Sequence, residues 1–162
     1  MHGIARQIVA GWEISGITTL ETGRTFNVGI NFDNGNVGAR GNFQRPNLVG
    51  DPFPSGFQHG AGPGTTWLDP AAFQVAPRYQ FGNLGRNVFK GPPLHNTDLG
   101  IFKNFTITER LKLQFRAELF NAFNDTNFST PGDTSFGDQN FGTITGTDTI
   151  QRQIQFGLKV IY

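Results

Sequence analysis

The sequence predicts an all-β fold with about four long antiparallel strands and one long irregular loop. Apolar and polar residues alternate with a period of two near both ends of the chain, which is the pattern of strands. The chain also contains 22 glycines and 9 prolines, a content that favours turns over helices. Eight of these nine prolines lie between Pro46 and Pro93, inside the longest stretch without alternation.

The clearest strand is predicted at residues 110–123, where apolar residues alternate strictly with charged and amide residues. One face would carry Leu111, Leu113, Phe115, Ala117 and Leu119. The other face would carry Lys112, Gln114, Arg116 and Glu118. Helical spacing would scatter these two sets around the circumference, so a strand is the better interpretation.

The last strand is predicted at residues 151–162. Its apolar face would consist of Ile154, Phe156, Leu158, Val160 and Tyr162. Its other face would consist of Gln151, Gln153, Gln155, Gly157 and Lys159. Its length is about the 9–11 residues with which a tilted strand crosses the hydrocarbon of a membrane.

Two further strands are predicted at 5–22 and 97–107, and a tight turn at 108–110 joins the latter to its neighbour. Lys103 shares its face with Leu99 and Ile101, which would be tolerable only near a membrane interface, where lysine can snorkel. The remaining segments are a long loop at 23–96 and a second loop at 124–150, with a short strand possible at 141–147.

Composition excludes several classes of protein. The net charge is only +1 and no basic block is present, so the electrostatic footprint of a nucleic-acid-binding protein is missing. The absence of cysteine rules out disulfides and thiolate chemistry. No apolar run approaches the ~20 residues of a membrane helix. The start of the sequence has no signal-peptide pattern, so an outer-membrane protein would have to begin upstream of Met1.

Alternation fits either a membrane barrel, with its apolar face on lipid, or a secreted soluble β-sandwich that acts as a binding or adhesion module. Long loops alternate with a short turn, which is the asymmetry of outer-membrane barrels. About four strands with a loop of this length would also leave open edges, which soluble proteins avoid. These features favour the barrel.

Motifs along the whole chain add a resemblance. The final octet, Gln155 to Tyr162, resembles the C-terminal signal that barrel-assembly machinery recognises, with Gln155, Gly157, Val160 and Tyr162 at its key positions. Other motifs, in order, are GWEISGI at 11–17, TGRTF at 22–26, RPNLVGDP at 45–52, WLDPAAF at 67–73, FGNLGRN at 81–87, DLGIFKNF at 98–105 and LQFRAELFNAFN at 113–124. In this order they resemble TonB-dependent receptors of the Oar-like subgroup, whose N-terminus carries a carboxypeptidase-regulatory-like domain.

The resemblance implies a fragment: the C-terminal part of a plugged barrel of about 22 strands that imports a bulky nutrient. Implied partners are outer-membrane lipid, the barrel-assembly machinery, the absent plug and barrel remainder, and TonB through the absent N-terminal part. The lipid-facing residues would be Leu111, Leu113, Phe115, Leu119, Ile154, Phe156 and Leu158. The lumen-facing residues would be Lys112, Gln114, Arg116, Glu118, Gln153 and Lys159.

No motif predicts a catalytic residue, a cofactor or a metal site, so an enzyme is not expected. His2, His59 and His95 lack metal-ligand spacing, and no serine has a nucleophile motif. The segment 33–36, Asp-Asn-Gly-Asn, is compatible with a calcium loop, but an ordinary Asn-Gly turn is favoured. Four aromatic residues of the long loop could contact a ligand, although packing within the loop is favoured: Trp67, Phe73, Tyr79 and Phe81.

Overall fold

A computed structural model describes residues 8–38, 44–56, 60–61 and 65–162 of the chain. The chain divides into two compact units. We call Met1–Leu20, His95–Thr126 and Thr149–Tyr162 the strand unit, and Glu21–Leu94 with Asn127–Asp148 the loop unit. Among the described residues, no helix has both the length and the apolar character that a membrane-crossing helix requires.

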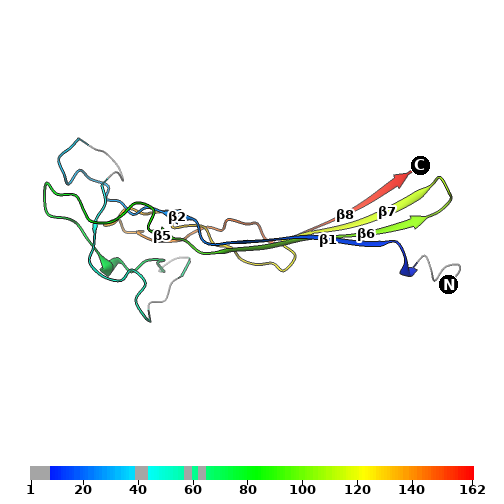
Figure 1. Cartoon of the computed structure of the whole chain (residues 1–162), viewed down its shortest axis with the longest axis horizontal. Coiled ribbons are helices and arrows are strands. Elements are labelled where there is room, and N and C mark those ends of the chain that lie inside the picture. Colours follow the sequence, from blue (N-terminus) through cyan, green and yellow to red (C-terminus); the bar gives the residue numbers. More distant parts are fainter. Residues whose placement is uncertain (1–7, 39–43, 57–59, 62–64) are drawn as a thin grey trace. The chain divides into compact units, whose positions relative to one another are not determined.

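Four long strands form one antiparallel sheet in the order β1-β6-β7-β8, side by side in Figure 1. Their bounds are β1 Trp12–Glu21, β6 Leu94–Thr106, β7 Lys112–Phe120 and β8 Gln153–Ile161. β6 pairs with β7 from Leu99↔Leu119 to Thr106↔Lys112, and β7 pairs with β8 from Lys112↔Ile161 to Phe120↔Gln153. The sheet confirms the predicted all-β class.

β1 runs against β6. The Asn104 N–H donates to the Gly11 carbonyl oxygen at 2.8 Å, and the hydroxyls of Thr18 and Thr97 lie 3.1 Å apart. Residue numbers therefore rise along one strand as they fall along the other. The predicted strand 5–22 extends beyond β1, and its residues 5–7 lie outside the described residues.

Local conformation ends two of these strands. Asn121 has a left-handed φ of +50°, so β7 stops at Phe120 although alternation suggests continuation to Phe123. The buried Asn121 side chain stabilises this end by donating to the carbonyl oxygens of Asp125 and Ile150. The turn between β6 and β7 covers 107–111, and Leu111 lies in it because the Leu111 carbonyl accepts from Ile107 N–H and Thr108 N–H at 3.0 Å each.

The loop unit contains only short elements: β2 (Thr25–Phe26) pairs with β5 (Phe89–Lys90), and β3 (Asn47–Leu48) pairs with β4 (Phe73–Gln74). Before β4, the 3-10 helix η1 (Pro70–Ala72) starts at Asp69, whose side chain accepts from the Ala71 N–H. The strand considered at 141–147 is absent, and Thr147 makes only an isolated bridge to Phe128.

A phenylalanine-rich core holds the loop unit together. The buried core residues are Phe26, Val28, Leu68, Ala72, Phe73, Leu84, Phe89 and Phe141. Phe73 is central, because its ring centroid lies 5.7 Å from that of Phe89 and 5.3 Å from that of Phe141. The edge-on ring geometry of both pairs is one that aromatic side chains prefer.

Candidate functional site

The strand register sorts the side chains of the sheet onto two faces. Residues paired directly across an antiparallel ladder project to the same side. One side, which we call the apolar face, carries Leu99, Ile101, Lys103, Phe105, Leu113, Phe115, Ala117, Leu119, Ile154, Phe156, Leu158 and Val160. Gly16 of β1 joins this face, since a Cβ on it would lie 2.8 Å from the Leu99 side chain.

The apolar face is exposed on β1 and β8 and half-buried on β6 and β7. Phe156 and Leu158 are each 68% exposed, and Ile14, which lies on the same side of β1 as Gly16, is 73% exposed. Phe115 and Phe156 stack on this face with ring centroids 5.9 Å apart. A contiguous apolar surface of this kind marks contact with a membrane or a partner.

Lys103 is the exception on the apolar face, and the chain itself satisfies its charge. Its Nζ donates to the carbonyl oxygen of Ile8 at 3.1 Å and to that of Ala10. The same ammonium lies 4.9 Å from the ring centroid of Trp12 and 5.3 Å from that of Phe105. Lys103 is only 3% exposed, so it is buried against β1 and its leading segment.

The opposite side, which we call the polar face, carries Gly100, Phe102, Asn104, Thr106, Lys112, Gln114, Arg116, Glu118, Phe120, Gln153, Gln155, Gly157, Lys159 and Ile161. Hydrogen bonds link three of these side chains: Gln114 Nε2 donates to Asn104 Oδ1, and Arg116 Nε donates to Gln114 Oε1. The Arg116 guanidinium lies 5.5 Å from the ring centroid of Phe102.

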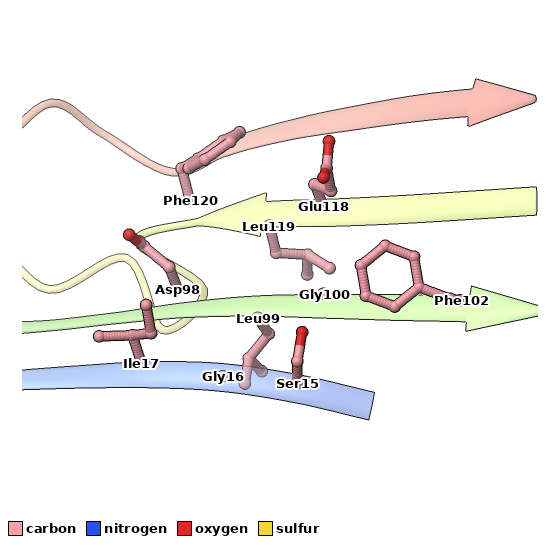
Figure 2. Close-up of a pocket in the computed structure, with 10 residues that line it drawn as sticks. All are labelled: Ser15, Gly16, Ile17, Asp98, Leu99, Gly100, Phe102, Glu118, Leu119 and Phe120. Atoms are coloured by element: carbon pink, nitrogen blue, oxygen red, sulfur yellow. The ribbon is translucent and has the colours of Figure 1, made fainter. Parts of the chain in front are cut away.

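A depression of about 230 Å³ lies on the strand unit, lined by Ser15, Gly16, Ile17, Asp98, Leu99, Gly100, Phe102, Glu118, Leu119 and Phe120. Figure 2 shows that these residues come from three adjacent strands, β1, β6 and β7. The register places most of the lining residues on the polar face, because Gly100 pairs with Glu118 and their alternate neighbours share that side. Three further lining residues, Gly16, Leu99 and Leu119, alternate with these and belong to the apolar face.

The two carboxylates beside the depression differ in their partners. Asp98 Oδ1 accepts from the Asn96 side chain at 3.0 Å and from the Asn121 N–H at 2.9 Å. Glu118 is half-buried and has no hydrogen-bond or ion-pair partner within the part of the chain that the structure describes. Glu118 is therefore the carboxylate that can take a partner from outside the chain.

Comparison with known protein families shows whether this sheet belongs to a membrane barrel or to a soluble β-sandwich. A family model described as "Outer membrane beta barrel domain" matches residues 1–155. The chain belongs to this family. Comparisons with curated proteins and with solved structures give no match. This outer-membrane barrel protein is located in the outer membrane, which decides between the barrel and the soluble β-sandwich that alternation left open.

The predicted assembly-signal residues divide between the two faces of the barrel protein's last strand. Gln155 and Gly157 lie on the polar face, opposite Glu118 and Arg116, and Val160 lies on the apolar face, opposite Leu113. Tyr162 follows the end of β8 and is 99% exposed. Their recognition by barrel-assembly machinery stays a prediction.

The structure brings no metal ligands together at segment 33–36. The Asp33 carboxylate accepts from the N–H groups of Val37 (3.1 Å) and Gly38 (2.7 Å), and from the Gln44 side chain. Within the described ranges, no three His, Cys, Asp or Glu residues form a metal-binding group. His2 and His59 lie outside those ranges.

Asn34 has a structural role that the sequence did not reveal. Its buried side-chain amide donates to the carbonyl oxygens of Ala76, Pro77 and Gln80, at 3.2, 3.0 and 3.0 Å. These bonds hold the segment in which Tyr79 adopts a left-handed φ of +64°. Asn34 therefore fixes a strained turn, because bulky residues rarely adopt such φ values.

The four aromatic residues of the long loop fall into two groups. Trp67 packs against the core and donates from Nε1 to the Lys90 carbonyl oxygen at 2.7 Å, and Phe73 lies inside the core. Tyr79 and Phe81 are 69% and 67% exposed. Trp67 and Phe73 therefore pack within the loop, whereas Tyr79 and Phe81 are available to contact other molecules.

Proposed function

We propose that this chain is the C-terminal part of an outer-membrane TonB-dependent transporter that takes up a bulky nutrient. The observation that carries the proposal is a single-layered sheet with one apolar and one polar face, in a chain of the outer-membrane barrel family. In the order β1-β6-β7-β8, the outer edges of β1 and β8 have no neighbour among the described residues. Closed membrane barrels have about eight strands or more, so this sheet fits a sector of a wider barrel.

The two faces fit the two environments of a barrel wall. On this proposal the apolar face contacts lipid, including Leu113, Phe115, Leu119, Ile154, Phe156 and Leu158. The polar face then lines the lumen, including Lys112, Gln114, Arg116, Glu118, Gln153 and Lys159. Leu111 contributes at the edge of this wall, since it lies in the turn before β7. Lys103 fits a lipid-facing position because backbone carbonyls and aromatic rings surround its charge.

The connections between strands fit the same orientation. The turn from β6 to β7 is short and tightly hydrogen-bonded, whereas β1 connects to β6 through the bulk of the loop unit. Outer-membrane barrels have short periplasmic turns and long extracellular loops. The loop unit would thus belong to the extracellular connections.

The assignment to TonB-dependent transport rests on the ordered motifs from Gly11 to Tyr162, which resemble the Oar-like subgroup. Such transport is coupled to inner-membrane energy, which gives the test. A strain lacking the gene should lose uptake of one bulky nutrient, and a strain lacking TonB should lose uptake of the same nutrient. Uptake of the radiolabelled nutrient, measured in both strains and in the parent strain, checks this expectation. If the nutrient still enters cells that lack TonB, the protein is a passive channel and the proposal is wrong.

A further inference from the structure

The depression on the polar face points to a ligand class. We propose that it binds the guanidinium or ammonium group of a small organic cation, with Glu118 as the charged partner and the Phe102 and Phe120 rings as walls. The cation site adds a solute class to the proposed function. It rests on the proposed transport only for the route by which the solute reaches the site.

Glu118 supplies the attraction. Its carboxylate is half-buried beside Gly100 and Gln155 in the strand register. Arg116, the nearest cation on the same face of β7, donates from Nε to Gln114 and lies against the Phe102 ring. A half-buried carboxylate without a donor is stabilised by a cation that donates hydrogen bonds.

The aromatic walls favour a cation over an anion or a neutral polar group. Phe102 and Phe120 offer ring faces but no hydrogen-bonding atom, and ring faces attract positive charge. The Phe102 ring already accepts a guanidinium, since Arg116 Cζ lies 5.5 Å from its centroid. A second planar cation, bound to Glu118 in the depression, would be attracted to the aromatic walls by the same cation–π interaction.

Gly100 allows Phe102 and Ser15 to approach each other at the wall of the depression. A Cβ at this position would lie 2.9 Å from the Phe102 ring and 3.0 Å from Ser15 Oγ. The Phe102 ring and the Ser15 hydroxyl therefore pack directly over Gly100, where no side chain would fit. Both residues line the depression, and the Ser15 hydroxyl can accept a hydrogen bond from a bound cation.

The charges of the polar face are separated along the strands. Lys112 and Lys159 lie toward the β6–β7 turn and Asp98 and Glu118 toward the other end, with Arg116 and Glu13 between them. The depression adjoins the acidic end. An organic anion would be attracted to the opposite end, so charge selects a cation here.

The test compares two planar probes of the same shape, butylguanidinium and neutral butylurea. Each is titrated by calorimetry into the outer-membrane protein extracted in a nonionic maltoside detergent. Butylguanidinium should bind with a dissociation constant of about 1–10 mM, an affinity within reach of so small a ligand. Glu118→Gln should weaken that binding about tenfold. Butylurea should bind at least tenfold more weakly than butylguanidinium.

Matched variants separate the site from general surface charge. Glu109→Gln removes the same charge in the β6–β7 turn and should leave binding unchanged. Ser15→Asp adds a second carboxylate to the wall and should tighten binding, which keeps the test informative if Glu118→Gln folds poorly. Equal binding of both probes, an equal loss in Glu109→Gln, or no effect of Glu118→Gln would overturn the proposal. Loss of TonB-dependence alone would not, because this binding is measured without uptake.

Discussion

In the strand unit, the outer strands β1 and β8 are exposed and the central strands β6 and β7 are half-buried, whereas in the loop unit short segments enclose a core of phenylalanines. Ile154, Phe156 and Leu158 of β8 are each more than half exposed, but Phe26, Phe73 and Phe89 of the loop unit are each less than 9% exposed. Regular hydrogen bonding and apolar burial are thus divided between two units. The strand unit has long ladders, and the loop unit has the core.

This difference indicates where each unit obtains its stability. Apolar side chains gain free energy when they leave water, whatever the apolar surroundings are. The loop unit supplies those surroundings from its own residues, so it should stay folded by itself. The sheet must obtain apolar surroundings from outside the chain, and on our proposal lipid supplies them on one face. Mutations should therefore affect the two units independently.

The largest effect is expected from Phe73→Ala in the loop unit. Phe73 is 5% exposed and contacts Phe89, Phe136 and Phe141, so its loss should cost the loop unit about 3–5 kcal/mol. Faster cleavage of the loop unit by protease would show this, while heat-dependent electrophoretic mobility should still report an assembled barrel. Phe81→Ala is the control, because Phe81 is exposed. Loss of barrel assembly in Phe73→Ala would contradict the independence of the two units.

The next effect concerns neighbouring residues of β8. Phe156→Lys places a charge on the apolar face, which costs about 2–4 kcal/mol near the middle of a membrane, whereas Gln155→Lys places it on the polar face. Phe156→Lys should greatly reduce the fraction of assembled protein in isolated outer membranes, and Gln155→Lys should not. Equal amounts of the two variants would refute the assignment of the apolar face to lipid.

A smaller effect is expected from Asn34→Ala. Three carbonyl oxygens would lose their donor, which should destabilise the turn at 76–80 by about 1–3 kcal/mol. Amide hydrogen exchange at Tyr79, whose N–H donates to the Asn34 carbonyl, should accelerate. Gln80→Ala retains the backbone carbonyl and should change exchange little. Unchanged protection in Asn34→Ala would show that the clamp does not stabilise the turn.

The smallest effect is a pH dependence at Asp33. Partial desolvation raises the pKa of Asp33. Hydrogen bonds from Val37 N–H, the Gln44 side chain and Gly38 N–H together lower the pKa by more, so it lies below its ordinary value. Its contribution to stability is present above about pH 4, the ordinary value for Asp, and is lost as the pH falls through the lowered pKa.

Amide exchange of Val37 and Gly38 should accordingly accelerate as the solution is acidified below about pH 4, beyond the normal change in the chemical exchange rate. Asp33→Asn should remove this additional dependence. A local response that persists in the variant would assign it to another group.

The sequence alone was sufficient to predict the all-β class and the separation of apolar and polar side chains. Alternation at Leu113–Leu119 and Ile154–Val160 reports directly on the two sides of a strand, because its period is set by the backbone. It could not predict the end of β7 at Phe120, since the left-handed turn at Asn121 depends on contacts with Asp125 and Ile150.

Only the tertiary structure decided which loop residues are buried and which polar residues meet. No periodicity separates Phe73 from Phe81, because an irregular chain gives its side chains no repeating direction. The depression at Glu118 likewise needs the register that brings Ser15, Gly100 and Glu118 together from three strands. Alternation determines the side of a strand on which a residue lies, but only pairing between distant segments determines its neighbours.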